Sequence, residues 1–376
     1  MIPYGKHSVD QADIDAVVDV LKNQFLTQGQ QVPAFESALA NYCGAGFATA
    51  VNSGTSALHI ACMALGLGQG DWLWTSPISF VASSNCALYC GAQVDFVDID
   101  PHTRNICVEQ LASKLATAER RPKVLVAVHF AGSSCDMQAI KTLCKRYDVA
   151  VIEDASHGLG GDYQQGKIGC NQFSDMTVLS FHPVKSITSA EGGAVLTNDA
   201  QLHMRCQLAS KHGITRDQQL MHGESEGDWY YQQIVLGYNY RLSDLHAALG
   251  ISQLSKLDNF IQRRRQLAAR YHQKLHHLPL TLPQPDEQSA WHIYVIEVEA
   301  DKRKAAFDAL RQAGIGVNVH YIPIHMQPFY RQLGFQAGDF PVAENFYAGA
   351  ITLPLYADLT EAEQDNVVET LHRVLA

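Results

Sequence analysis

Between residues 47 and 154, short apolar runs alternate with longer segments of helical periodicity, and this alternation limits the possible folds more than any other feature. The unit repeats every ~25 to 30 residues, as expected for strand–helix–strand crossovers. Such connections produce a mostly parallel sheet that helices cover on both faces. The predicted strands are 47–51, 72–75, 94–97, 124–128 and 149–152, and the predicted helices between them are 56–65, 80–89, 108–118 and 137–147.

The flanking segments continue the α/β pattern. A helix with a capping box formed by Ser8 and Gln11 is expected near the start, followed by a helix at about 32–42. Further strands are predicted at 176–180 and 194–197, and further helices from 198 to about 212, at 242–257 and at 259–276. The polar stretch 213–233 between them has a length typical of functional or interfacial loops.

The length of 376 residues predicts two domains, because ~150 residues per domain is a common size. We place the boundary near residue 255, just before the long charged helix at 259–276. Residues 1–255 would form the large domain with the parallel sheet, and residues 256–376 a smaller C-terminal α/β domain. The smaller domain is predicted to contain strands 291–298 and 317–321 and helices 303–313 and 361–375.

Composition excludes several classes of protein. The net charge of −10 argues against nucleic acid or an anionic membrane as a partner. The nine cysteines are scattered without a Cys-x-x-Cys pair, which is typical of reduced thiols in a cytoplasmic protein, and no metal-binding spacing occurs among the 17 histidines. No apolar run reaches the ~20 residues of a membrane span. We therefore expect a cytoplasmic protein that binds no metal.

Ligands of a parallel sheet bind at the carboxyl ends of its strands, and two such ends suggest cofactor contacts. The turn at Gly54, Thr55 and Ser56 opens a helix after strand 47–51. Its free N–H groups and the helix dipole suit a phosphate, although ordinary N-capping would use the same residues. Phe80 follows strand 72–75 and could stack on a flat ring or pack in the core.

Two later strand ends carry an acid and a lysine. Asp154 ends an apolar strand, where a buried carboxylate is costly unless it has a partner. That partner could be a protonated pyridine nitrogen, or Asp154 could be a buried structural cap. Lys185 lies in the loop after strand 176–180, and it could be either a Schiff-base lysine or an ordinary solvated loop lysine. Pyridoxal phosphate requires a phosphate cradle, a stacking ring, a carboxylate and a lysine. The chain has no dinucleotide fingerprint, P-loop or nucleophile elbow that would favour other chemistry.

The chain resembles the DegT/DnrJ-type sugar-nucleotide aminotransferases, which have the fold-type I, aspartate-aminotransferase-like architecture of pyridoxal-phosphate-dependent transferases. The matching motifs occur in family order along nearly the whole chain. They are Leu26-Thr-Gln-Gly29, Asn52-Ser-Gly-Thr-Ser-Ala-Leu58, Thr75-Ser-Pro-Ile-Ser-Phe-Val-Ala82, Glu153-Asp-Ala-Ser-His157, Ser180-Phe-His-Pro-Val-Lys185, Glu191-Gly-Gly193, Gly237-Tyr-Asn-Tyr-Arg241 and Val319-His-Tyr-Ile-Pro323.

This resemblance implies roles for individual residues. Lys185 would form the internal aldimine with pyridoxal 5′-phosphate and move protons during catalysis. Asp154 would pair with the pyridine nitrogen, Phe80 would stack on the ring, and His157 would lie near the phenolic oxygen. The phosphate would be held by Gly54, Thr55, Ser56, Ser180 and, from the neighbouring subunit of a homodimer, Asn239.

A narrower resemblance concerns the substrate. The opening Ile-Pro-Tyr-Gly-Lys and the Phe-His-Pro-Val-Lys segment are similar to the branch that serves pseudaminic acid biosynthesis for surface and flagellin glycans. That branch aminates C4 of a UDP-4-keto-6-deoxy-N-acetylhexosamine, UDP-2-acetamido-2,6-dideoxy-β-L-arabino-hexos-4-ulose, with L-glutamate expected as amino donor. Its substrate contacts correspond to Tyr4, Gln24, Phe25, Leu26, Thr27, Val319, His320, Tyr321 and Ile322.

Three alternatives remain open at this point. The chain could aminate C3 or C4 of a dTDP- or GDP-linked sugar within the same family. It could be a sugar dehydratase on the same scaffold, but those relatives replace the lysine with histidine, and Lys185 is present. It could be a non-catalytic regulator. The roles of His182 and His325 are also undecided.

Overall fold

The computed structural model describes residues 1–375, and within them the largest sheet has seven strands in the order β1-β9-β8-β5-β4-β2-β3. Neighbours from β8 to β3 are parallel, whereas β9 runs antiparallel to both β1 and β8. The sheet is therefore mostly parallel, as predicted. Its strands are β1 (Phe47–Val51), β2 (Trp72–Thr75), β3 (Gln93–Phe96), β4 (Val124–Val128), β5 (Ala150–Asp154), β8 (Met176–Ser180) and β9 (Gly193–Thr197).

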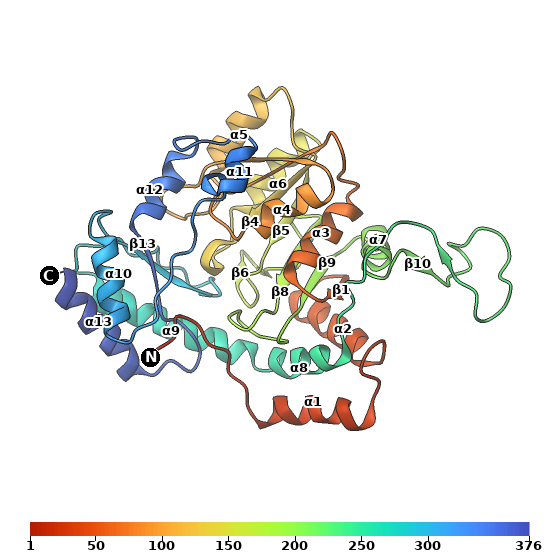
Figure 1. Cartoon of the computed structure of the whole chain (residues 1–376), viewed down its shortest axis with the longest axis horizontal. Coiled ribbons are helices and arrows are strands. Elements are labelled where there is room, and N and C mark those ends of the chain that lie inside the picture. Colours follow the sequence, from red (N-terminus) through yellow and green to blue (C-terminus); the bar gives the residue numbers. More distant parts are fainter. Residues whose placement is uncertain (376) are drawn as a thin grey trace.

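Helices cover both faces of this sheet (Figure 1). One face packs on α3 (Gly54–Ala64), α4 (Ala82–Tyr89) and α7 (Ala200–Ser210). The opposite face packs on helices whose apolar residues form two further cores. These helices are α2 (Gln31–Cys43), α5 (Val108–Thr117), α6 (Met137–Arg146) and α8 (Asp244–Leu254), and α1 (Gln11–Asn23) lies against α8. Burial on both faces explains why the strands are apolar throughout rather than alternating.

The C-terminal third has its own apolar core around a two-stranded antiparallel sheet. The sheet consists of β12 (Tyr294–Glu297) and β13 (Ala350–Leu353). The helices of this part are α9 (Leu257–Leu275), α10 (Arg303–Gln312), α11 (Pro328–Gln332), α12 (Pro341–Gly349) and α13 (Glu361–Leu375). The division at residue 255 remains a prediction.

A long hairpin leaves the body of the molecule between α7 and α8 (Figure 1). Its strands β10 (Ile214–Thr215) and β11 (Gln232–Gln233) are short, and the loop between them carries exposed aromatic side chains at Trp229 and Tyr231. A second short hairpin, β6 (Asp162–Tyr163) and β7 (Gly166–Lys167), follows β5. The polar stretch predicted between the helices is thus a projecting arm with exposed aromatic residues just before β11.

Two sequence-based expectations were wrong. The first helix is capped by Asp10, whose side chain accepts from the backbone N–H of Asp13 in a reciprocal capping box, so Ser8 and Gln11 do not form that box. Residues 317–321 form only an isolated bridge from Asn318 to Thr352, because this segment turns toward the sheet edge of the first part.

Within residues 1–375, no helix is long and apolar enough to cross a membrane, and no cluster of side chains is suited to a metal ion.

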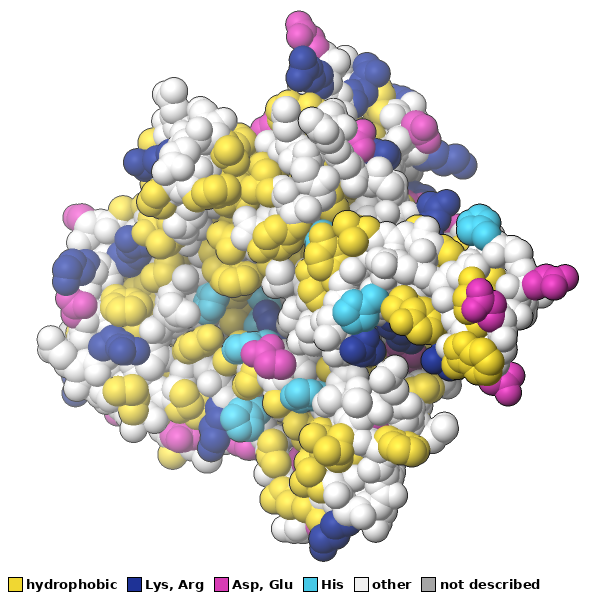
Figure 2. Space-filling model, turned by 45° about the vertical axis from the view of Figure 1, so that its right-hand side comes forward, with side chains coloured by type: hydrophobic (Ala, Val, Ile, Leu, Met, Phe, Trp, Pro, Cys, Tyr) yellow, Lys and Arg dark blue, Asp and Glu magenta, His cyan; other side chains and the backbone are white. Residues whose placement is uncertain are grey.

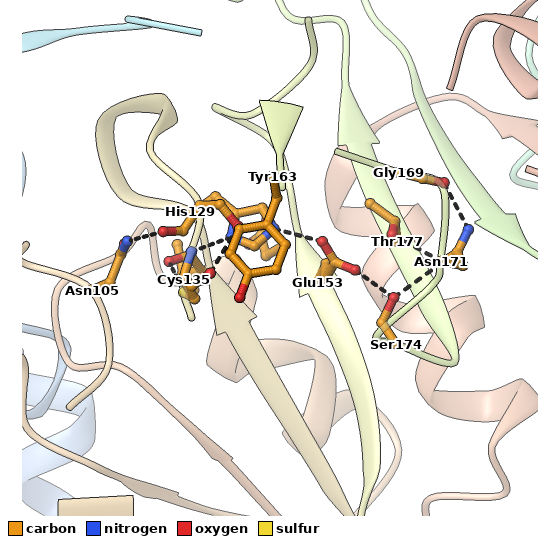
Figure 3. A network of polar contacts seen from close by, with 12 residues as sticks. Asn105, His129, Cys135, Glu153, Tyr163, Gly169, Asn171, Ser174 and Thr177 are labelled. Atoms are coloured by element: carbon orange, nitrogen blue, oxygen red, sulfur yellow. Dashed lines mark hydrogen bonds and ion pairs between the residues drawn. The ribbon is translucent and has the colours of Figure 1, made fainter. Parts of the chain in front are cut away.

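A buried polar network stabilises the carboxyl end of β5 (Figure 3). The carboxylate of Glu153 accepts hydrogen bonds from Nε2 of His129, at 2.7 Å, and from the hydroxyl of Ser174, at 2.5 Å. The backbone N–H of Cys135 donates to Nδ1 of His129, so the ring carries its proton on Nε2. Asn171 joins the network through Ser174. A buried acid is tolerated here because its oxygen atoms have partners.

We predict that Glu153→Leu lowers the free energy of unfolding by about 3 kcal/mol, because it leaves the His129 N–H buried without an acceptor and removes the shorter hydrogen bond of the Ser174 hydroxyl. Denaturant titration at a fixed protein concentration measures this change. The matched control is Glu369→Leu on the exposed side of α13, which should change stability by less than about 0.5 kcal/mol. Equal effects of the two substitutions would contradict the role of the network.

Candidate active site

The carboxyl ends of the parallel strands surround a cavity of about 460 Å³, a volume common for small-molecule sites. Its walls come from the turns after β1, β2, β5 and β8, from the N-terminal segment, and from the segments before β12 and around residue 320. Figure 2 shows hydrophobic and histidine side chains around a hollow on one face of the molecule. The cavity therefore lies between the main sheet and the C-terminal part.

The N-terminus of α3 forms one wall and offers unpaired backbone donors. Ser53 caps the helix by accepting from the N–H of Ser56, which leaves the N–H groups of Gly54 and Thr55 without a partner in the described part of the chain. A Cβ atom on Gly54 would lie 3.0 Å from Cβ of Ser180, so glycine allows the turns after β1 and β8 to approach closely. The arrangement suits an anionic group.

Asp154 is buried at the end of β5 and lines the cavity. One carboxylate oxygen accepts from the hydroxyl of Ser83 at 2.6 Å, and the other accepts from the backbone N–H of Ser156 at 3.1 Å. Ser79 extends this chain by contacting the Ser83 hydroxyl at 2.7 Å. These bonds hold the carboxylate in place.

Lys185 enters the cavity from the loop after β8. Its backbone N–H donates to the carbonyl of His182, which forms a turn and directs the lysine out of the strand. Burial lowers the pKa of Lys185 to about 8, although the Asp154 carboxylate acts in the opposite direction. The neutral form of this amine is therefore far more populated near physiological pH than in an ordinary lysine, which makes it available as a nucleophile and a base.

Histidine and tyrosine rings close the inner end of the cavity. Nε2 of His157 lies 3.1 Å from the hydroxyl of Tyr321. Nδ1 of His320 lies 2.8 Å from the hydroxyl of Thr352. Burial and the charge of Lys185 lower the pKa of His320 to about 4 and that of His157 well below its usual range. Both imidazoles are neutral hydrogen-bonding groups at physiological pH.

Many of the predicted site residues line this one cavity. They are Tyr4, Gly54, Thr55, Phe80, Asp154, His157, Ser180, Lys185, Val319, His320 and Tyr321. Phe80 is 59% exposed, which excludes its alternative interpretation as a core residue. Their functional roles remain predictions.

Other predicted residues lie elsewhere within the chain. The hydroxyl of Ser56 is turned inward and donates to Asn52 at 2.6 Å. Ile322 is 44% exposed, and Asn239 lies on the surface at the base of the hairpin arm. The remaining ones, Gln24, Phe25, Leu26 and Thr27, form an exposed segment after α1.

The cavity also contains residues to which sequence reasoning assigned no role. Ser83 anchors Asp154, Glu191 adds a second carboxylate, and His292 arrives from the segment before β12. His182 lines the cavity, whereas His325 is buried outside it and pairs with Glu344 at 2.9 Å. No sequence pattern singled out Ser83 or His292, because tertiary packing brings both to the cavity.

Comparison with known proteins agrees with this geometry. The model of the DegT/DnrJ/EryC1/StrS aminotransferase family matches residues 7–372. A Campylobacter jejuni relative, named UDP-4-amino-4,6-dideoxy-N-acetyl-beta-L-altrosamine transaminase, is 37% identical over 383 residues that cover all of this chain and 98% of the relative.

Two solved structures share the fold over the whole chain. Helicobacter pylori PseC, described as an aminotransferase involved in the biosynthesis of pseudoaminic acid, is 33% identical with a TM-score of 0.92, over 100% of this chain and 99% of that one. The putative sugar aminotransferase Spr1654 from Streptococcus pneumoniae, in its PLP form, is 28% identical with a TM-score of 0.90, over 100% of both chains. The chain has the fold-type I α/β architecture and belongs to the DegT/DnrJ/EryC1/StrS aminotransferase family.

Proposed function

We propose that this aminotransferase uses pyridoxal phosphate to aminate C4 of a UDP-4-keto-6-deoxy-N-acetylhexosamine, with L-glutamate as amino donor. The observation that carries the proposal is the meeting of Lys185, Asp154 and the free N–H groups of Gly54 and Thr55 in one cavity. The names of the Campylobacter and Helicobacter relatives support the choice of sugar and the place in pseudaminic acid biosynthesis.

The residues present fit this cofactor. The N-terminus of α3 leaves donors for a phosphate, and the close approach of Gly54 to Ser180 would be blocked by a side chain. The buried Nδ1 atom of His157 has no hydrogen-bond partner within residues 1–375, as expected for a group that a ligand satisfies. When bound, pyridoxal phosphate supplies the carbonyl group that carries the amino group and a ring that withdraws electrons.

The chain's own groups supply the remaining chemistry. Nζ of Lys185 would hold the cofactor and could both accept and donate the proton that amino transfer requires, because its lowered pKa makes both protonation states accessible near neutral pH. Asp154, held by Ser83, would pair with the ring nitrogen and favour its protonated form. Phe80 offers an exposed ring for stacking.

The sugar nucleotide would contact Tyr4 and the segment from Val319 to Ile322. Residues Gln24 to Thr27 and Asn239 do not line the cavity of their own chain, so we propose that they act in a homodimer, Asn239 at the partner's cofactor phosphate. Exposed apolar side chains support such an interface, since Phe25, Trp229 and Leu236 are 79%, 70% and 72% exposed.

A sugar dehydratase on this scaffold is the second candidate, and the lysine argues against it. That reaction in relatives uses a histidine in place of Lys185, whereas here the amine reaches the cavity beside Asp154. A non-catalytic regulator would not need the lowered pKa of Lys185. An assay with dTDP- and GDP-linked keto sugars distinguishes amination of those substrates from amination of the UDP-linked sugar.

The proposed function predicts that the purified protein is yellow with pyridoxal phosphate and converts the UDP-4-keto sugar and glutamate into the amino sugar. Lys185→Ala should remove the visible absorbance and lower the turnover rate by at least about 10⁴-fold, because no other amine lines the cavity in residues 1–375. Absorbance spectra and mass spectrometry of the product measure this. Lys141→Ala on α6 is the control and should behave as wild type. Full turnover by Lys185→Ala would contradict the assignment, and preference for a dTDP-linked sugar would overturn only the choice of nucleotide.

The lowered pKa of Lys185 predicts how cofactor attachment depends on pH. The neutral amine is the reactive form, so the rate at which added pyridoxal phosphate reacts with the cofactor-free protein should rise with pH and level off above about 8. Rapid-mixing absorbance measurements give this profile. Asp154→Asn removes the charge that raises the pKa, so its profile should shift to lower pH. A rate that continues to rise to pH ~10.4, the value of a free lysine, would rule out the lowered pKa.

Mixed dimers test the role of Asn239. Asn239→Ala and Lys185→Ala subunits should each be inactive alone, but after mixing they should regain activity at one of the two sites of the hybrid dimer. The expected recovery is about a quarter of wild-type activity, because half of the randomly mixed dimers are hybrids. Mixing Lys185→Ala with Lys185→Arg is the control and should restore nothing. Absence of rescue at every ratio would place Asn239 in the site of its own subunit.

A further inference from the structure

His292 reaches the cavity from the C-terminal part of the chain and has no role in the function proposed above. It precedes β12, is 4% exposed and lines the same wall as His157. The two imidazole rings lie with their centroids 4.3 Å apart and their planes tilted by 42°. His292 is therefore placed beside a predicted cofactor contact, although no sequence motif connects the two.

The backbone around His292 is held firmly against the main sheet. The N–H of His292 donates to the carbonyl of Ala131 at 2.8 Å, and the N–H of Ala290 donates to the carbonyl of Gly132 at 3.0 Å. A Cβ on Gly132 would lie 2.8 Å from the backbone nitrogen of Trp291, so this approach requires glycine. Trp291 has a φ of 45°, an unusual conformation for a residue with a side chain. Such strain persists only where surrounding contacts impose it.

Arg264 supports this segment from α9 and lies behind His292. Arg264 is 2% exposed, and its Nη1 donates to the carbonyls of His292 and Leu355 at 3.0 and 2.9 Å. No carboxylate forms a salt bridge with it in residues 1–375. Burial lowers the pKa of Arg264 to about 10, which leaves it charged. A buried cation without an anion is costly, and here its hydrogen bonds hold the backbone of His292.

The side chain of His292 lacks the partners that buried polar groups normally have. Its Nδ1 atom is buried without a hydrogen-bond partner, and Nε2 also makes no hydrogen bond to the described residues. Nδ1 of His157 is likewise unpaired, while its Nε2 contacts Tyr321. An unsatisfied buried group costs about 1–3 kcal/mol, so a ligand atom is the expected partner.

The charges around His292 restrict the kind of ligand atom. Burial, followed by His157, Lys185, Arg264 and His320, lowers the pKa of His292 well below its usual range. The imidazole is thus neutral and can donate one hydrogen bond and accept another. The nearby cationic groups, Lys185 and Arg264, favour an electron-rich ligand atom. An oxygen atom that is anionic or strongly polarised meets these requirements.

We propose that His292 is a further ligand-binding residue of this cavity, that it hydrogen-bonds an oxygen atom of the bound ligand, and that Arg264 positions it. The proposal rests on the proposed function. The oxygen belongs either to the phenolic group of pyridoxal phosphate or to the keto or hydroxyl group of the sugar, and these two sources have the same chemistry toward a neutral imidazole.

The test compares His292→Leu with His292→Asn in protein loaded with pyridoxal phosphate. Leucine removes both ring nitrogens at similar volume, whereas asparagine keeps an amide group near the position of Nδ1. A phenolic contact predicts that His292→Leu shifts the pH midpoint of the cofactor's visible absorbance upward by about one unit, because a hydrogen bond to the anion is lost. A sugar contact predicts an unchanged spectrum and a KM for the UDP-4-keto sugar raised about tenfold.

Either result supports the proposal, and in both cases His292→Asn should recover part of the effect. His203→Asn is the matched control, because His203 pairs with Thr49 at 3.0 Å outside the cavity and should change neither quantity. Wild-type absorbance midpoint, KM and kcat in His292→Leu would overturn the proposal. Absence of cofactor absorbance in the wild-type protein would instead contradict the proposed function.

The positioning role of Arg264 has its own test. Arg264→Met should change the same quantity as His292→Leu, and the double variant should show no additional change, since the arginine would affect the ligand through His292. Arg264→Lys, which keeps the charge, serves if the methionine variant does not fold, and circular dichroism checks the fold of each. Additive effects of the two substitutions would show that Arg264 does not act through His292.

Discussion

The carboxyl end of β5 is the point on which the site depends, because two consecutive acids are buried there and each needs its own partners. Successive side chains of a strand face opposite sides of a sheet. Glu153 is satisfied on one side by His129 and Ser174, and Asp154 on the other by Ser83 and the Ser156 backbone. The Glu153 network thereby anchors the strand end from which Asp154 enters the cavity.

The rest of the site is arranged around this carboxylate by close backbone contacts. A Cβ on Gly193 would lie 2.5 Å from the carbonyl carbon of Ser53, and one on Gly54 would touch Ser180. These two glycines let β9 and the turn after β8 pack against the start of α3, which brings the unpaired N–H groups and Lys185 to the same cavity. Burial and the Asp154 carboxylate act in opposite directions on the pKa of Lys185, and burial prevails.

Sequence patterns located most elements of the main sheet, since each strand is a buried apolar run between helices of clear periodicity. They failed where tertiary contacts decided the structure. Residues 317–321 are rich in strand-forming side chains, but the segment turns to close the cavity with His320 and Tyr321. Asp10 and Ser8 are equally good caps by type, and the reciprocal bond with Asp13 selects Asp10. In contrast, the sequence order of Phe80, Asp154 and Lys185 correctly predicted that these residues meet at the strand ends, because all three line the same cavity.

The sequence by itself determined the alternating α/β fold, the family and the residue types of the cavity, because periodicity and motif order are local properties of the chain. Only the tertiary structure decided which of those residues share one cavity within a chain, and it left Ser56, Asn239 and the segment from Gln24 to Thr27 outside. It also brought in His292, held through its backbone by Ala131 and Arg264. Contacts between segments more than a hundred residues apart depend on packing and on buried hydrogen bonds, which no local pattern encodes.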